Sequence, residues 1–179
     1  NENTSECGNF NIDEQAYELD KAKKEESKKL CHERRKALEE SVLGKIPDDH
    51  PVVFISYSWD SEEHEKWVLK LSADLSAQGI FVLLDKYLED GSNLPAYMDL
   101  GIERADKVLI IGTPKYQEKC YDPSSGVAFE DCIIRAGISR NIGTKKFIAC
   151  LREGNFKISF PIYIGIKKGH DFTAEENYD

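Results

Sequence analysis

The 179-residue chain is 40% hydrophobic and 10% aromatic, which is enough to bury one good-sized core with an extension but not two full domains. Its net charge of -9 and pI near 5.0 argue against a nucleic-acid surface, which depends on clustered Lys and Arg, and against an acidic membrane as partner. The five cysteines have neither CxxC nor Cys/His ligand spacing, so we expect no disulfide framework, no metal site and a reducing, cytoplasmic location. The apolar runs are shorter than the roughly 20 residues of a membrane helix, so we expect no membrane span.

The first 49 residues differ in composition from the rest of the chain. A run rich in Lys, Glu, Ala and Leu extends to Glu40 and predicts a long helix. Its apolar residues are too sparse for a sustained heptad seam, which favours an exposed helical arm or linker over the alternative, a dimerising coiled coil. Two prolines and two adjacent aspartates between Gly44 and Pro51 predict a boundary. We therefore expect a helical extension over residues 1–49 and one domain over residues 51–179.

From Pro51 onward, short apolar strands alternate with amphipathic helices. The predicted strands are residues 52–56, 80–84, 108–111, 146–151 and 162–166, and the predicted helices are residues 61–78, 93–105, 114–120 and 126–138. This alternation is typical of parallel strands that crossover helices bury on both faces. The sequence therefore predicts a flavodoxin-like α/β fold, in which ligands bind beyond the carboxyl ends of the strands.

Two loops at that edge of the sheet carry residues that can bind a ligand. The loop 56–61, SYSWDS, offers Tyr57 and Trp59 for stacking on a base and free amides at a helix start for phosphate. The alternative is that the rings cover the sheet edge and the polar residues cap the helix. The segment 85–95, DKYLEDGSNLP, is long and polar for a connection in a compact domain, which is typical of a functional loop. Its alternative is an ordinary solvent loop whose leucines pack down.

The run SSGVAFEDCII places Glu130 on an otherwise apolar helix face, because residues three and four apart are neighbours on a helix. Desolvation raises the pKa of such a carboxyl, and carboxyls with shifted pKa values are common at functional sites. The alternative is a structural residue at the edge of the face, paired with Arg135 or Lys115. We expect the adjacent Asp131 to face solvent or a lysine.

Several common catalytic and nucleotide-binding motifs are missing from the sequence. No GxGxxG or GxxxxGK[ST] run follows a predicted strand, and there is no Gly-x-Ser-x-Gly elbow. His64 lies in the first turn of a predicted helix, where we expect a surface residue. These absences argue against a dinucleotide-binding fold of the Rossmann type, a P-loop and a serine hydrolase.

Four runs, in this order and spacing, resemble the Toll/interleukin-receptor (TIR) domain superfamily, most closely its bacterial SEFIR-like branch. They are VVFISYSWDSEEHEKWVLKLSADLSAQGIFVLLD, DGSNLP, ADKVLIIGTPKYQEK and GVAFEDCII. The resemblance covers roughly residues 51–151 and is expected to continue to the end of the chain. It implies a five-stranded parallel sheet with helices on both faces, here preceded by the helical arm. It also implies that residues 86–95 form the BB loop of the family, which is used in assembly and shapes the site.

Many TIR domains of bacteria, plants and animals hydrolyse NAD at the nicotinamide–ribose bond with one glutamate, and Glu130 matches its position. The resemblance thus implies an NAD glycohydrolase or cyclase that is activated by self-association and, in bacteria, serves antiphage defence. NAD is then the substrate, with no separate cofactor, and a fused or associated effector domain is a further expected partner. In several family enzymes a Trp stands four residues before the glutamate, where this chain has Gly126.

The resemblance implies two sets of contact residues. The implied substrate contacts are Ser56, Tyr57, Ser58, Trp59, Asp85, Lys86 and Tyr87. The implied self-association residues are Leu88, Gly91, Asn93 and Pro95. The rival interpretation is a non-catalytic TIR/SEFIR module that makes homotypic contacts, in which Glu130 is incidental.

One carboxylate is sufficient for the implied reaction. The nicotinamide of NAD is cationic and departs neutral, so no general acid is required, unlike in ordinary glycosidases. An ionised Glu130 accepts hydrogen bonds from ribose hydroxyls and opposes the positive charge of the developing oxocarbenium ion. Because desolvation favours the protonated acid, we expect Glu130 to be only partly buried.

Overall fold

The computed structural model describes residues 10–89, 91–165 and 169–178. The chain divides into two compact units, Asn1–Ser41 and Val42–Asp179. Across the described residues, no helix has both the length and the apolar character needed to cross a bilayer. The cysteines within these ranges are all free, whereas Cys7 lies outside them.

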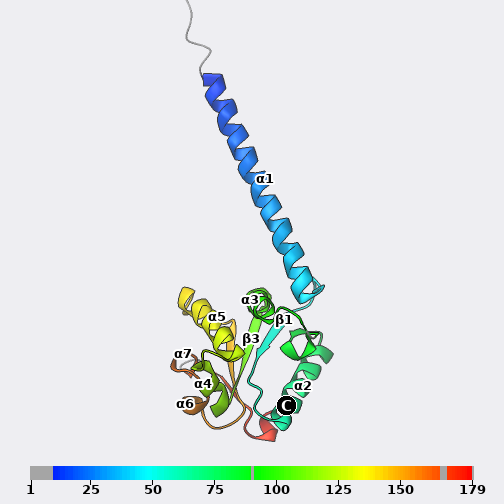
Figure 1. Cartoon of the computed structure of the whole chain (residues 1–179), viewed down its shortest axis with the longest axis vertical. Coiled ribbons are helices and arrows are strands. Elements are labelled where there is room, and N and C mark those ends of the chain that lie inside the picture. Colours follow the sequence, from blue (N-terminus) through cyan, green and yellow to red (C-terminus); the bar gives the residue numbers. More distant parts are fainter. Residues whose placement is uncertain (1–9, 90, 166–168, 179) are drawn as a thin grey trace, which may run out of the picture. The chain divides into compact units, whose positions relative to one another are not determined.

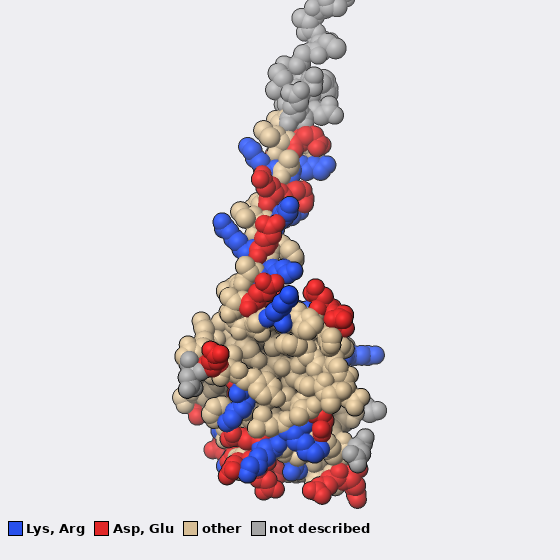
Figure 2. All heavy atoms as spheres, turned by 90° about the vertical axis from the view of Figure 1, so that its right-hand side faces the viewer, with Lys and Arg blue, Asp and Glu red and all other residues tan. Residues whose placement is uncertain are grey.

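The described residues of the first unit all lie in helix α1 (Phe10–Leu43), and the predicted N-terminal helix is confirmed. Lysines and acidic residues alternate along it, as Figure 2 shows, and its described side chains are almost all exposed. Pairs one turn apart, such as Lys24 with Asp20 at 2.7 Å, support the helix. Each such exposed pair contributes only about 0.3–0.5 kcal/mol, so the helix depends on many of them.

The second unit contains the predicted five-stranded, all-parallel sheet, which is confirmed. Its strands are β1 (Val52–Ser56), β2 (Phe81–Leu83), β3 (Lys107–Gly112), β4 (Phe147–Leu151) and β5 (His170–Asp171). They lie in the order β2-β1-β3-β4-β5, with β1, β3 and β4 in the interior of the sheet, and Figure 1 labels β1 and β3. The chain leaves β1 toward β2 on one side, whereas β3 lies on the other side. The loops that follow β1 and β3 therefore diverge at the carboxyl end of the sheet, where such folds bind ligands.

Helices cover both faces of the sheet, as predicted. They are α2 (Glu62–Ala77), α3 (Leu94–Arg104), α4 (Pro114–Cys120), α5 (Gly126–Arg140), α6 (Phe156–Ser159) and α7 (Ile162–Gly165), with 3-10 turns at Asp85–Tyr87 and Glu175–Asn177. Alternate residues of β1 point to opposite faces. Val53 and Ile55 pack with α2, whereas Val52 and Phe54 pack with residues of α3, α4 and α5. The sheet therefore has a core on each side, and the two buried acidic residues of α5, Glu130 and Asp131, lie on the side of the second core.

The predicted fifth strand over residues 162–166 is wrong. Ile162–Gly165 is the short helix α7, Ile166 lies outside the described residues, and the fifth strand is His170–Asp171. Pro161 precedes α7 and its carbonyl accepts hydrogen bonds from the amides of Ile164 and Gly165, so the apolar run turns instead of extending. The actual β5 is short and exposed, which leaves no hydrophobic pattern in the sequence.

Candidate functional site

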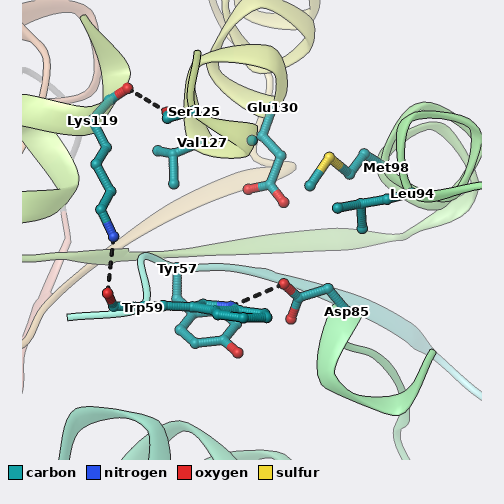
Figure 3. Close-up of a pocket in the computed structure, with 10 residues that line it drawn as sticks. Tyr57, Trp59, Asp85, Leu94, Met98, Lys119, Ser125, Val127 and Glu130 are labelled. Atoms are coloured by element: carbon teal, nitrogen blue, oxygen red, sulfur yellow. Dashed lines mark hydrogen bonds between the residues drawn. The ribbon is translucent and has the colours of Figure 1, made fainter. Parts of the chain in front are cut away.

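A pocket of about 290 Å³ opens at the carboxyl ends of β1 and β2 (Figure 3). It is lined by Tyr57, Trp59, Asp85, Leu94, Met98, Lys119, Ser125, Gly126, Val127 and Glu130. These residues come from the loops after β1 and β2, from helices α3, α4 and α5, and from Ser125, which caps α5. The pocket thus joins both loops that the sequence singled out to the helix that carries Glu130.

Glu130 lies in the second turn of α5. Ser125 caps the start of this helix, because its hydroxyl accepts a hydrogen bond from the Ala128 amide. Its side chain is buried, with 4% of the residue exposed, and its carboxyl group points into the pocket (Figure 3). Partial burial was the expectation, and it is wrong. Glu130 shares the inward face of α5 with Val127 and Ile134, so it cannot move outward while these residues fill the core.

A chain of hydrogen bonds supports the Glu130 carboxyl from behind. The Ser56 hydroxyl donates a hydrogen bond to Glu130 Oε2, and the Tyr116 hydroxyl lies 3.1 Å from Ser56 Oγ. Ser56 has a single proton, so when it donates to Glu130, Tyr116 must donate to Ser56. Burial raises the pKa of Tyr116, which keeps its proton available. Strand β1 and helix α4 therefore both orient the carboxyl group.

The carboxyl group of Glu130 holds its proton near neutral pH. Burial raises its pKa to about 8, the negative charge of Asp85 adds to this increase, and the Ser56 hydrogen bond opposes it. An ionised Glu130 would therefore be stabilised by a positive charge in the pocket. Burial also raises the pKa of Asp85. A cation in the pocket would stabilise the ionised forms of both acidic groups, so the pocket favours a cationic ligand.

Trp59 forms the wall of the pocket opposite Glu130. Its ring lies across the pocket from the Glu130 carboxyl, and its indole nitrogen donates to Asp85 Oδ2 at 3.2 Å (Figure 3). Trp59 is 57% exposed, so its ring is open to a ligand, whereas Tyr57 is buried beneath it. The buried Asp85 Oδ1 has no hydrogen-bond partner among the described residues. A flat ligand can therefore stack on the indole, beside the Asp85 carboxyl group.

Gly126 lies beside Met98, at the position that a tryptophan occupies in several family enzymes. A Cβ atom built there would lie 3.3 Å from Met98 Cε, closer than an ordinary contact. Met98 thus occupies the space beside Gly126, and the exposed indole of this pocket comes from Trp59 on the opposite wall.

The structure brings four of the sequence-predicted site residues to the pocket: Glu130, Tyr57, Trp59 and Asp85. Ser56 lies behind Glu130 rather than on the wall. The other three do not line the pocket: Ser58, whose hydroxyl lies 3.5 Å from Thr113 Oγ1; Lys86, which pairs with Glu65 at 2.9 Å; and Tyr87, whose hydroxyl lies 2.8 Å from Ser72 Oγ.

Sequence reasoning missed much of the wall. The missed lining residues are Leu94, Met98, Lys119, Ser125 and Val127. The first two lie on an amphipathic helix that the sequence predicts, and α5 places Val127 one turn before Glu130. No sequence signal marks Lys119, because its position depends on contacts with a loop 60 residues earlier.

Two neighbouring expectations are also corrected. Asp131 is buried rather than solvent-facing, because it accepts hydrogen bonds from Arg135 at 2.7 Å and from the Tyr163 hydroxyl. Arg135 is thus the partner of Asp131 and not of Glu130. His64 is buried with its ring beside Tyr57, and burial lowers its pKa.

The segment predicted to mediate self-association has mixed exposure. Leu88 packs against the core, and the Asn93 side chain caps α3 by accepting from the Ala96 amide. Gly91 has a φ of +87°, a left-handed conformation that favours glycine, and Pro95 is exposed in the first turn of α3. Asp90 lies outside the described residues. Gly91, Asn93 and Pro95 are therefore exposed to a partner, whereas Leu88 is partly buried.

Comparison with known proteins assigns the family. Residues 53–177 match the model of the family described as TIR domain. The crystal structure of a prokaryotic SEFIR domain is 35% identical, with 72% of this chain and 93% of that chain covered and a TM-score of 0.55. The TIR domain of the Toll-related receptor TRR-2 from Hydra magnipapillata is similar in fold at 17% identity, with coverage of 69% and 86% and a TM-score of 0.50. No curated protein matches. The chain belongs to the TIR domain family.

Proposed function

We propose that this protein acts through its TIR domain in two ways: by association with other TIR domains, and by cleavage of NAD in the Glu130 pocket. Association is the function that family membership supports most directly, because TIR domains commonly bind one another. A single observation supports cleavage: a buried carboxyl faces an exposed indole across a pocket whose second acidic group also favours a cation.

The reaction breaks the bond between the ribose C1′ and the nicotinamide nitrogen. The bonding electron pair stays on nitrogen, so nicotinamide leaves neutral and positive charge develops on the ribose. Ionised Glu130 opposes this charge in a buried setting, where electrostatic stabilisation is strong. Water then adds to C1′ and releases a proton, which gives ADP-ribose, or a nucleophile within the substrate adds instead and gives a cyclic product.

The protonation state of Glu130 depends on whether substrate is bound. Glu130 is mostly protonated near neutral pH, since its pKa is about 8. The cationic nicotinamide ring favours the ionised form when it enters, and the Ser56 hydrogen bond does so as well. Binding of the correct substrate therefore helps to produce the catalytic form of the residue.

Replacement of Glu130 with Gln is expected to reduce nicotinamide release by about a thousandfold, because the amide has no charge to oppose the oxocarbenium ion. The assay follows nicotinamide by chromatography at high protein concentration with a crowding agent. Glu63→Gln is the matched control, since Glu63 is exposed on α2. Nicotinamide release by Glu130→Gln at the wild-type rate would exclude the catalytic role.

Association is supported by the exposure of Gly91, just before α3, and of Pro95, in the first turn of α3. Pro95→His is expected to weaken self-association by about tenfold or more, in the range of a residue that anchors an interface. Sedimentation velocity over a range of concentrations measures this change. Pro51→His is the control, because Pro51 is exposed at the amino end of β1. Circular dichroism must show the same fold for all three proteins. Equal association of wild type and Pro95→His would show that Pro95 is not part of the interface.

We further propose, from the resemblance to bacterial TIR domains, that the product or the loss of NAD acts in antiphage defence in the cytoplasm. The expected partners are NAD, further copies of the domain, and a fused or associated effector domain. Phage infection of cells that express wild type or Glu130→Gln tests this role. Protection by both proteins would show that defence does not depend on NAD cleavage.

A further inference from the structure

The Glu130 pocket has opposite charges at its two sides. Figure 3 shows Asp85 at one side and Lys119 at the other, with Glu130 and Trp59 between them. A ligand that spans the pocket therefore meets the Asp85 carboxyl group at one end, Glu130 in the middle and the Lys119 ammonium group at the other end.

Contacts of the protein hold the Lys119 ammonium group at the rim. Its Nζ donates to the Trp59 carbonyl at 2.9 Å and lies 3.8 Å from Asp60 Oδ1. The side chain is 32% exposed, and an ammonium group has three donors, so donor capacity remains for a ligand. Because the Lys119 side chain is already ordered, it loses little conformational entropy when a ligand binds.

A second hollow of about 300 Å³ meets the pocket at Trp59 and Lys119. It is also lined by Lys115, Glu118 and Asp122. Lys115 donates to the Asp60 carbonyl at 2.9 Å. Lys115 and Lys119, both on α4, are thus held against the same loop, the one that follows β1. Trp59 and Lys119 line both hollows, which therefore lie next to each other.

We propose that Lys119, supported by Lys115, binds the diphosphate of a dinucleotide and sets its direction in the site. This inference rests on the proposed NAD cleavage. The pocket of about 290 Å³ is at the small end of ligand sites, which run from about 300 Å³ upward, so it holds the nicotinamide and its ribose but not a whole dinucleotide. The remainder of the substrate leaves past Lys119 toward the second hollow.

Charge selects this direction over the reverse. The cationic nicotinamide lies near Glu130 and Asp85, and the diphosphate lies near the ammonium of Lys119. The reverse direction would place the diphosphate against two carboxyl groups. The site therefore favours a nicotinamide dinucleotide over nicotinamide riboside, which has the same scissile bond but no phosphate.

Lys119→Gln tests the proposal, because Gln can still donate to the Trp59 carbonyl but has no charge. We expect kcat/KM for NAD to fall tenfold to a hundredfold, as for loss of a charge-assisted hydrogen bond. We expect kcat/KM for nicotinamide riboside to change less than about twofold. Lys66→Gln, at an exposed lysine paired with Glu62, should leave both values unchanged.

The outcomes separate this site from the proposed reaction. Equal losses on NAD and nicotinamide riboside, or no loss on NAD, would overturn the diphosphate site. If wild type cleaves neither substrate, the proposed catalysis fails, and calorimetric binding of ADP-ribose then decides the site. A dissociation constant at least about tenfold weaker in Lys119→Gln supports it, and an unchanged constant or no binding by wild type overturns it.

Discussion

Glu130→Gln is expected to raise the free energy of unfolding by about 3 kcal/mol near neutral pH and to leave it unchanged near pH 4. The pKa of Glu130 is raised from 4.5 to about 8 by burial, so the folded protein keeps a proton that the unfolded chain releases. Between these two pKa values, each pH unit costs the wild-type fold about 1.4 kcal/mol. The uncharged Gln removes that cost.

Urea unfolding of both proteins at several pH values measures this difference. The contribution of Glu130 to stability is fully present below the unfolded pKa of 4.5 and is lost as pH rises toward about 8. The difference between variant and wild type should therefore grow over this interval and level off above it. Glu63→Gln, at an exposed position, controls for the change of net charge. A Glu130→Gln protein that is less stable than wild type near neutral pH would contradict a protonated, buried Glu130.

The rate of nicotinamide release is expected to rise steeply with pH. Catalysis needs the ionised carboxylate, and kcat/KM follows the ionisation of the free enzyme. With a pKa of about 8, kcat/KM should increase about fiftyfold from about pH 6 to about pH 8 and then approach a plateau. The profile of kcat should lie at lower pH, because the bound nicotinamide cation stabilises the carboxylate.

Ser56→Ala should shift this kcat/KM profile to higher pH, because the Ser56 hydrogen bond lowers the pKa of Glu130. Ser72→Ala is the control: Ser72 is equally buried but bonds to Tyr87. A general packing defect would lower the rate at every pH without a shift. A flat kcat/KM profile from about pH 6 to about pH 9 would show that the ionisation of Glu130 does not limit the reaction.

Most of the fold could be predicted from the sequence because its signals are local. Apolar runs mark the central strands, and hydroxyl residues such as Ser61 and Ser125 cap the helices that follow. The position of Glu130 on an inward helix face also follows from local spacing. The last strand has two exposed residues, so it has no such signal.

The environment of Glu130 could not be predicted in the same way. Its burial is tolerated because Ser56, 74 residues earlier, donates to it. Lys119 reaches the pocket because it bonds to the Trp59 carbonyl, 60 residues earlier. Asp131 is buried because Tyr163, 32 residues later, donates to it. Such contacts between distant segments are set by the packed structure and leave no spacing pattern in the sequence.

The most direct test of the central claim is nicotinamide release by wild type and Glu130→Gln near pH 8, on samples whose folding has been verified by urea unfolding. We predict that wild type releases nicotinamide, whereas Glu130→Gln is at least as stable and releases about a thousandfold less. Release by a folded Glu130→Gln protein at the wild-type rate would contradict the assignment of Glu130 as the catalytic carboxylate.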